Sequence, residues 1–167
     1  RLVQHGIREG LGSATHFGYN SARGDIIIGM DADLSQPAED VVRIYKKITQ
    51  GDDLVIGSRF VTGGSQVNKP LIRDDGARIS NVVVRLIFRI SVKDVTHTFR
   101  GFRRSILTTI GSNLDEKDHP GFQIQFTYWC ERNGYKISEV PTCFTERDRT
   151  RGRSKISLFR TMAGLIR

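Results

Sequence analysis

The decapeptide DIIIGMDADL, residues 25–34, decides the fold class of this 167-residue chain. It contains three consecutive isoleucines, and a continuous run of β-branched residues is typical of a strand covered on both faces of a parallel sheet. Asp31 and Asp33 follow directly where that strand is expected to end. Because open parallel sheets bind ligands beyond the carboxyl ends of their strands, this stretch predicts both an α/β domain and the place of its functional site.

Helical and extended patterns alternate on either side of this strand. The near-helical apolar spacing of residues 12–23 ends at Gly24. A second helix begins at Pro37 and ends at Gly51, and residues 54–57 form the next strand. The remaining pattern predicts, in chain order, a basic helix over 73–89, a short strand near Val95, helices over 103–113 and 122–133, a strand over 136–140 and a last amphipathic helix from about 157. This alternation favours an α/β domain with a largely parallel sheet.

Composition and charge narrow the class of protein. Lys and Arg number 26 against 18 Asp and Glu, and the net charge of +8 suggests an anionic partner. The longest apolar run, residues 82–90, is interrupted by Arg85 and Arg89 and is too short to span a membrane. Cys130 and Cys143 lie too far apart for a CxxC redox motif or a metal knuckle, so we interpret both as buried thiols.

Asp31 and Asp33 are the first candidate site residues. Two carboxylates separated by one residue can point in different directions as the chain leaves a strand. Mg²⁺ and Mn²⁺ prefer such hard oxygen ligands and are usually held by one or two carboxylates together with substrate phosphates. The pair therefore predicts a clamp for a cation and a diphosphate. The alternative is that both aspartates form a turn or cap ahead of Pro37.

Arginine and lysine residues form the second candidate group. Arg59 comes directly after the strand over 54–57, and Arg73 and Arg78 lie close together in the basic helix. A dense basic segment then spans residues 147–155. The planar fork of arginine matches phosphate oxygens, and lysine offers a compact point charge. A merely solvated basic face remains the alternative for part of this segment.

The order of the motifs resembles that of the family 2 glycosyltransferases with the GT-A fold, and within them the dolichyl- or polyprenyl-phosphate mannosyltransferases. Seven segments spread over nearly the whole chain carry this resemblance: GLGSA at 10–14, DADLS at 31–35, GSRF at 57–60, DVTHTFR with FRR at 94–104, FQIQ at 122–125, EVP at 139–141 and GRSK at 152–155. The resemblance implies a three-layer α/β sandwich with a mostly parallel sheet, incomplete at its N-terminus. Residues 1–155 would then be a partial GT-A domain, and residues 156–167 the start of a C-terminal amphipathic helix.

The same resemblance implies an activity and a set of site residues. It implies transfer of a sugar, with mannose from GDP-mannose expected, to a dolichyl or polyprenyl phosphate at the cytoplasmic face of a membrane. Asp31 and Asp33 would be the catalytic residues that hold Mg²⁺ or Mn²⁺ and the donor diphosphate. The residues implied for the donor and lipid phosphates are Arg59, Arg73, Arg149 and Lys155. Because a lipid phosphate is already an anionic nucleophile, catalysis would rest on positioning and charge neutralisation.

The chain also departs from the family pattern. Four positions differ: Ser35 stands for a metal-coordinating Gln, with Gln36 beside it, Ala77 for a Ser, Thr98 for a Gly and Gln125 for a Glu. Relatives begin with a V-P-x-Y-N-E strand, which is absent before Arg1. We therefore expect a fragment that is poorly stable and inactive by itself, with an open edge on the strand over 26–30.

Three alternatives stay open on the sequence. A family 2 transferase could use another donor or acceptor, such as UDP-glucose or a polysaccharide. The chain could also be a catalytically inactive remnant. The basic charge permits a nucleic-acid-binding module, but no RNP, KH or helix-turn-helix pattern accompanies it, so we expect no nucleic-acid partner.

Overall fold

The computed structural model describes residues 2–4, 6, 10–67, 71–114 and 121–145. Within these residues the central sheet has four strands in the order β1-β4-β2-β5, with bounds Ile26–Gly29 for β1, Arg100–Arg103 for β4, Leu54–Ser58 for β2 and Ile137–Pro141 for β5. Strand β4 is antiparallel to both β1 and β2, and β2 is parallel to β5. Three of the four strands therefore run in one direction, which confirms the mostly parallel sheet.

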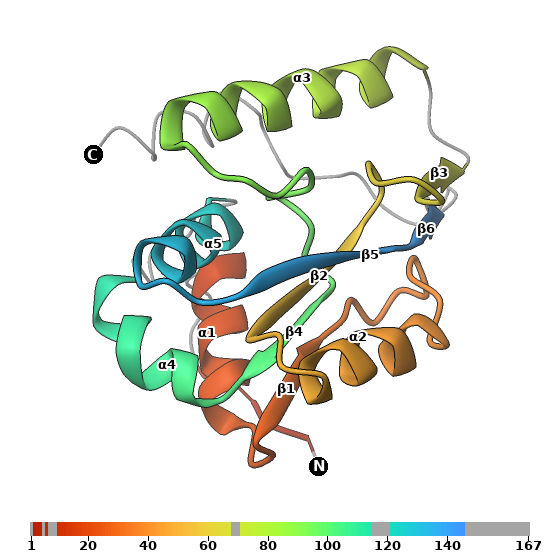
Figure 1. Ribbon diagram of the computed structural model, residues 1–167. Coiled ribbons are helices and arrows are strands. Elements are labelled where there is room, and N and C mark those ends of the chain that lie inside the picture. The colour runs from red at the N-terminus through yellow and green to blue at the C-terminus, as the bar shows by residue number, and fades with distance from the viewer. Residues whose placement is uncertain (1, 5, 7–9, 68–70, 115–120, 146–167) are drawn as a thin grey trace.

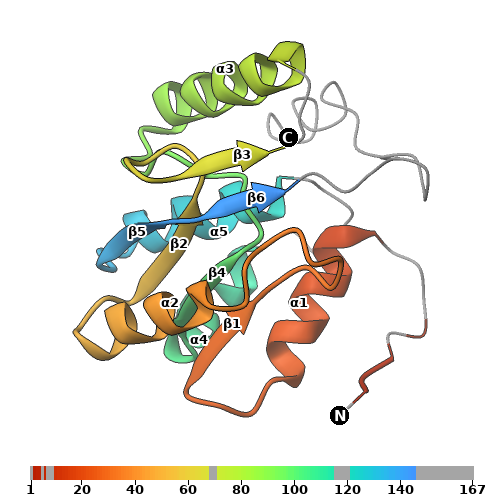
Figure 2. The ribbon, with the colours of Figure 1, turned by 90° about the vertical axis from the view of Figure 1, so that its right-hand side faces the viewer.

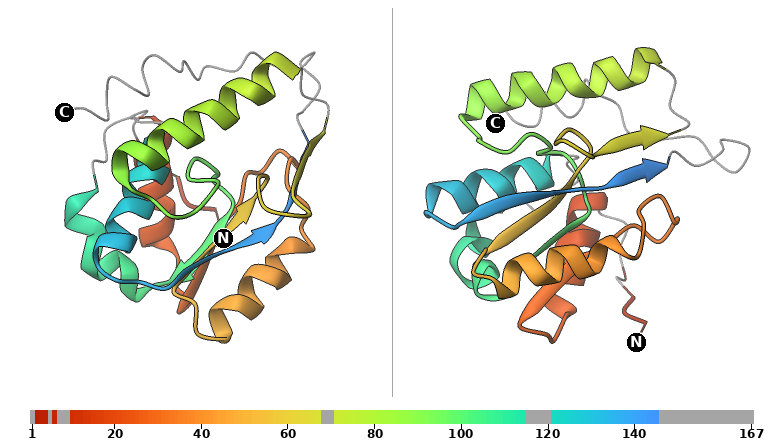
Figure 3. Two further views of the ribbon diagram at one scale, coloured as in Figure 1. Left: turned by 45° about the horizontal axis from the view of Figure 1, so that its top comes forward. Right: turned by 45° about the vertical axis from the view of Figure 1, so that its right-hand side comes forward.

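Helices cover both faces of this sheet, so the domain has three layers (Figures 1 and 3). The helices are α1 Leu11–Ser21, α2 Asp40–Thr49, α3 Leu71–Phe88, α4 Ser105–Ile110 with the 3₁₀ turn η1 Gly111–Asn113, and α5 Phe122–Arg132. Side chains alternate along β2: Leu54 and Ile56 face the core formed with α1, α4 and α5, whereas Val55 faces α2. Helix α3 lies apart from the sheet, at the top of Figure 1.

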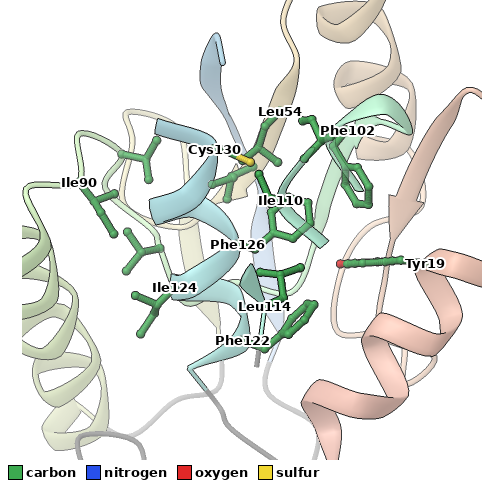
Figure 4. Packing of buried hydrophobic residues seen from close by; sticks show 14 of the residues in the cluster. Tyr19, Leu54, Ile90, Phe102, Ile110, Leu114, Phe122, Ile124, Phe126 and Cys130 are labelled. Carbon is green, nitrogen blue, oxygen red and sulfur yellow. The ribbon is translucent and has the colours of Figure 1, made fainter. Parts of the chain in front are cut away.

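The larger core lies on the side of α1, α4 and α5 and is rich in aromatic rings (Figure 4). Tyr19 of α1 meets Phe102 of β4 edge to face, with ring centroids 4.8 Å apart. Phe126 of α5 packs on the same Phe102 ring at 4.8 Å. Cys130 lies fully buried beside them, which confirms it as a buried thiol, and burial raises its pKa to about 12. Cys143 is only partly buried, so the same prediction was wrong for that residue.

A second, two-stranded sheet lies above the central one and was not predicted from the sequence. It pairs β3, Ser65–Val67, with β6, Cys143–Thr145, in parallel (Figure 2). Both strands have three residues. Their extended state depends on each other more than on any local pattern, because three residues carry too little periodicity to indicate a strand.

The prediction of a strand near Val95 was wrong. Val95 lies in a loop, and the strand in this part of the chain is β4, five residues later. Its sequence, RGFR, has no strand-like alternation. Gly101 sits in it because a Cβ there would lie 2.3 Å from Cγ2 of Ile44, so only glycine lets α2 pack this closely on the strand.

Two other expectations concern the ends of the chain. Strand β1 lies at the edge of the central sheet, paired with β4 on one side, and no strand of the described residues pairs with its other side. The basic segment 147–155 and the amphipathic helix over 156–167 lie outside the described residues, so both stay predictions. Where the chain is described, it contains no helix with the length and apolarity that a bilayer crossing requires.

Candidate active site

Asp31 and Asp33 lie just past the carboxyl end of β1, as the sequence predicted. The chain turns sharply there, with Leu34 in the left-handed region at φ 62°. The Oδ1 atom of Asp33 accepts the backbone N–H of Ser35 at 3.1 Å and closes this turn. Asp33 is therefore both exposed and part of a turn, so the turn-forming alternative is correct for it and does not exclude ligand binding.

Asp31 is held by two side chains. The amide of Gln36, which is 3% exposed, accepts the Asp31 backbone N–H at 3.0 Å and donates from Nε2 to Oδ2 of Asp31 at 2.9 Å. The hydroxyl of Thr98 donates to the same Oδ2 atom at 2.8 Å. None of the described residues donates to Oδ1 of Asp31. One carboxylate oxygen is thus anchored by two donors, and the other accepts no hydrogen bond from the described residues.

The donor set at this turn fits a divalent cation. Oδ1 of Asp31 and the exposed carboxylate of Asp33 are hard oxygen ligands of the kind that Mg²⁺ and Mn²⁺ prefer. The described part of the chain contains no group of three His, Cys, Asp or Glu residues that could hold a metal by itself. These two carboxylates therefore suit a cation that takes its remaining ligands from substrate phosphates and water.

Arg59 lies directly after β2, and its guanidinium is engaged by Asp94. Nε and Nη2 of Arg59 lie 2.7 Å from the two carboxylate oxygens of Asp94, and the Arg59 backbone N–H donates to the same group at 3.1 Å. Burial alone would raise the pKa of Asp94, but these hydrogen bonds and the arginine charge outweigh it and hold that pKa below its usual range. This ion pair, which the sequence did not predict, places a buried carboxylate against the Arg59 guanidinium.

One loop contacts both Asp31 and Arg59. Residues 94–98 carry Asp94, which holds Arg59, and Thr98, which holds Asp31. Arg73 lies within α3, whereas Arg149 and Lys155 lie outside the described residues. The predicted phosphate-binding roles of all four basic residues stay predictions.

Arg100 fixes the path of this loop from inside the protein. Its side chain is fully buried, and its guanidinium donates to the carbonyl oxygens of Val95 and His97, with Nη2 lying 2.6 Å from the latter. The same group donates to the Gln123 carbonyl and the Thr127 hydroxyl of α5, both at 3.1 Å. No carboxylate of the described residues pairs with it. The sequence places Arg100 in the DVTHTFR segment but does not indicate this role, because burial of an arginine has no local signal.

His97 is the second buried titratable group of the loop. It is 4% exposed, contacts the Gly57 carbonyl through Nδ1 and meets the ring of Phe144 on β6. Burial lowers its pKa to about 4, with the charge of Arg59 acting in the same direction and Asp94 opposing it. The imidazole is therefore neutral at neutral pH, and Nδ1–H donates to Gly57. A neutral, enclosed ring is suited to packing and not to anion binding.

The chain is similar in sequence to proteins of known family. Residues 1–111 match glycosyl transferase family 2. The chain is 36% identical over 145 residues to the polyprenol monophosphomannose synthase of Mycolicibacterium smegmatis, covering 84% of this chain and 54% of that protein. It is 35% identical over 159 residues to the undecaprenyl-phosphate mannosyltransferase of Micrococcus luteus, covering 93% of this chain and 64% of that protein.

A solved structure supports the fold. The glucosyl-3-phosphoglycerate synthase of Mycobacterium tuberculosis, in complex with Mn²⁺ and UDP-glucose, superposes with a TM-score of 0.63 at 20% identity. The match covers 96% of this chain and 53% of that one. The chain thus spans between about half and two thirds of the length of these relatives.

Proposed function

This chain belongs to glycosyl transferase family 2 and has the GT-A fold, and on that premise we propose that it transfers mannose from GDP-mannose to a dolichyl or polyprenyl phosphate. The observation that carries this proposal is the identity of 35–36%, over most of this chain, to two enzymes named for transfer to such lipids. Family membership favours a transferase over the nucleic-acid-binding module that the basic charge permits.

Asp31 and Asp33 are proposed to hold Mg²⁺ or Mn²⁺ at the end of β1. The cation would neutralise the diphosphate that departs from the sugar. Gln36 and Thr98 support this role, because they anchor Oδ2 of Asp31 and leave Oδ1 for a ligand. A pre-set carboxylate costs no rearrangement when the cation binds.

The basic residues are proposed to position the two phosphorylated substrates. Nη1 of Arg59 donates to none of the described residues, so this edge of the guanidinium remains for a phosphate oxygen while Asp94 fixes the rest. Arg73, Arg149 and Lys155 are proposed to hold the other donor and lipid phosphate oxygens. The lipid phosphate is itself the nucleophile and is anionic at neutral pH, so the site needs no general base. Asp94, buried against Arg59 with a lowered pKa, and His97, buried with a pKa of about 4, are both weak bases.

Peripheral binding to the cytoplasmic face of a membrane is proposed through α3. The last three turns of this helix expose apolar side chains: Ile79 at 63%, Val82 at 50%, Leu86 at 74% and Ile87 at 64%. Arg78 and Arg89 are exposed on or directly after the same helix. An apolar stripe flanked by arginines suits the boundary between acyl chains and anionic headgroups.

Sugar transfer by the purified protein, as its gene encodes it, tests the proposal. The protein is incubated with Mn²⁺, either dolichyl or undecaprenyl phosphate, and radiolabelled GDP-mannose or UDP-glucose, and the lipid-extractable label is counted. We expect labelled lipid from GDP-mannose alone. Label from UDP-glucose instead would overturn the proposed donor, and no label from either would overturn the activity.

A further inference from the structure

The carboxylate of Asp31 is anchored unevenly. Its Oδ2 atom receives two hydrogen bonds, from Nε2 of Gln36 at 2.9 Å and from Oγ1 of Thr98 at 2.8 Å, while Oδ1 receives none from the described residues. Gln36 comes from the turn that Asp31 itself begins, five residues away. Thr98 comes from a loop 67 positions away, so its hydrogen bond fixes the position of the carboxylate relative to the rest of the domain.

The loop that carries Thr98 is held firmly enough to fix the position of the Asp31 carboxylate. Arg100 ties its backbone to α5 through the Val95 and His97 carbonyls, and Asp94 at its other end is locked by Arg59. The peptide N–H of Asp94 also donates to the Glu139 carboxylate of β5 at 3.0 Å. Thr98 therefore projects from a loop fastened to three separate elements.

We propose that Thr98 is a positioning residue for the cation site, and that its hydroxyl, together with Gln36, fixes the Asp31 carboxylate so that Oδ1 is presented as the ligand oxygen. The inference rests on the proposed function, since it assigns Asp31 to a divalent cation. Hydrogen bonds to a ligating carboxylate restrict its rotation, and removing such a partner weakens metal binding even though it touches no metal.

Binding of Mn²⁺ alone and in the presence of GDP, measured by isothermal titration calorimetry on the gene-encoded protein, tests this inference. Thr98→Val keeps the branched shape and removes the donor, so we expect about tenfold weaker Mn²⁺ binding. Thr98→Ser restores the hydroxyl and is expected to bind within about twofold of the wild type. Thermal unfolding of each variant is followed by circular dichroism, and Thr98, which is only partly buried, should shift the midpoint little.

Thr142→Val is the matched control. Thr142 is 1% exposed and donates to Oδ2 of Asp40 at 2.7 Å. The variant therefore loses the same kind of hydroxyl-to-carboxylate hydrogen bond, but at a site away from Asp31. We expect a lower unfolding midpoint with unchanged Mn²⁺ affinity.

The possible failures are distinguishable. Unchanged Mn²⁺ affinity in Thr98→Val, or equal weakening in Thr98→Ser, would overturn the positioning role while leaving the proposed function in place. Equally weakened Mn²⁺ binding in Thr142→Val would show that the loss of affinity in Thr98→Val reflects general stability, and it would overturn the positioning role of Thr98 as well. A wild-type protein that binds no Mn²⁺ with or without GDP would overturn the metal-dependent function and this inference together.

Discussion

The guanidinium of Arg59 forks onto the carboxylate of Asp94, with Nε and Nη2 each 2.7 Å from a different oxygen, although the two residues lie 35 positions apart. Asp94 is fully buried and the Arg59 side chain is 10% exposed. The charge of an arginine expected to bind phosphate is therefore shared with a buried partner, and the pair joins the end of β2 to the loop over 94–98.

Removal of one partner from this pair should be costly. Asp94→Ala leaves the Arg59 charge poorly compensated, and loss of one member of a buried pair costs about 3–5 kcal/mol. Urea denaturation followed by circular dichroism measures the change in free energy of unfolding. Arg59→Lys, with Asp94 in place, should retain little of the free energy of unfolding that the pair contributes, because an ammonium group cannot make two parallel bonds to a carboxylate. A loss below about 1 kcal/mol for Asp94→Ala, the range of exposed pairs, would contradict the geometry.

Acid should unfold the protein in two stages with different causes. The folded-state pKa of Asp94 is lowered, so its contribution is complete above the unfolded value of about 4 and is lost as the pH falls below that value. The folded-state pKa of His97 is about 4, against 6.5 for an ordinary histidine. Between pH 6.5 and 4, His97 is therefore protonated in the unfolded chain but neutral in the folded protein. The free energy of unfolding should fall as the pH drops through this range.

His97→Gln separates the two stages. The charged groups that act on His97 are Asp94, Arg59 and Arg100, and all three remain in this variant. We expect the unfolding free energy of the variant to be flatter than that of the wild type between pH 6.5 and 4, with the loss below pH 4 retained. An unchanged slope between pH 6.5 and 4 would show that His97 titrates normally.

Gly101→Ala should destabilise the domain by overpacking. The new Cβ would lie 2.3 Å from Cγ2 of Ile44 and 3.0 Å from Cδ1 of Ile48, so α2 would have to move off β4. Overpacking of this kind costs about 1–3 kcal/mol. Gly111→Ala is the control, since a Cβ there meets no atom within 4 Å and the backbone is helical. Thermal melts that place the two variants at the same midpoint would contradict the close packing of α2 on β4.

Exposed apolar residues of α3 should carry membrane binding. Leu86→Ser with Ile87→Ser removes two side chains that are 74% and 64% exposed, so it should release the protein from anionic phosphatidylglycerol vesicles without lowering its unfolding midpoint. Val42→Ser with Tyr45→Ser makes the same kind of change on α2, where the exposed fractions are 53% and 51%, and should leave vesicle binding intact. Co-sedimentation with vesicles reports both, and equal effects of the two double variants would argue against α3 as the contact.

Local patterns predicted most helices and strands but not all. Apolar periodicity and end signals are properties of neighbouring residues, so α1, β1, α2 and β2 lie close to their predicted ranges. Strand β4 has arginines at both ends and a glycine inside, and it is extended because β1 and β2 pair with it on either side. The short strands β3 and β6 likewise depend on their pairing.

The sequence by itself determined the α/β class, the family and the place of Asp31 and Asp33 after a buried strand, because these depend on residue types and their order along the chain. Only the tertiary structure decided what those residues touch. Thr98 reaches Asp31 across 67 positions, and Arg100 fastens the intervening loop from within the core. Hydrogen bonds between distant residues depend on the folded path of the chain, for which local spacing carries no signal.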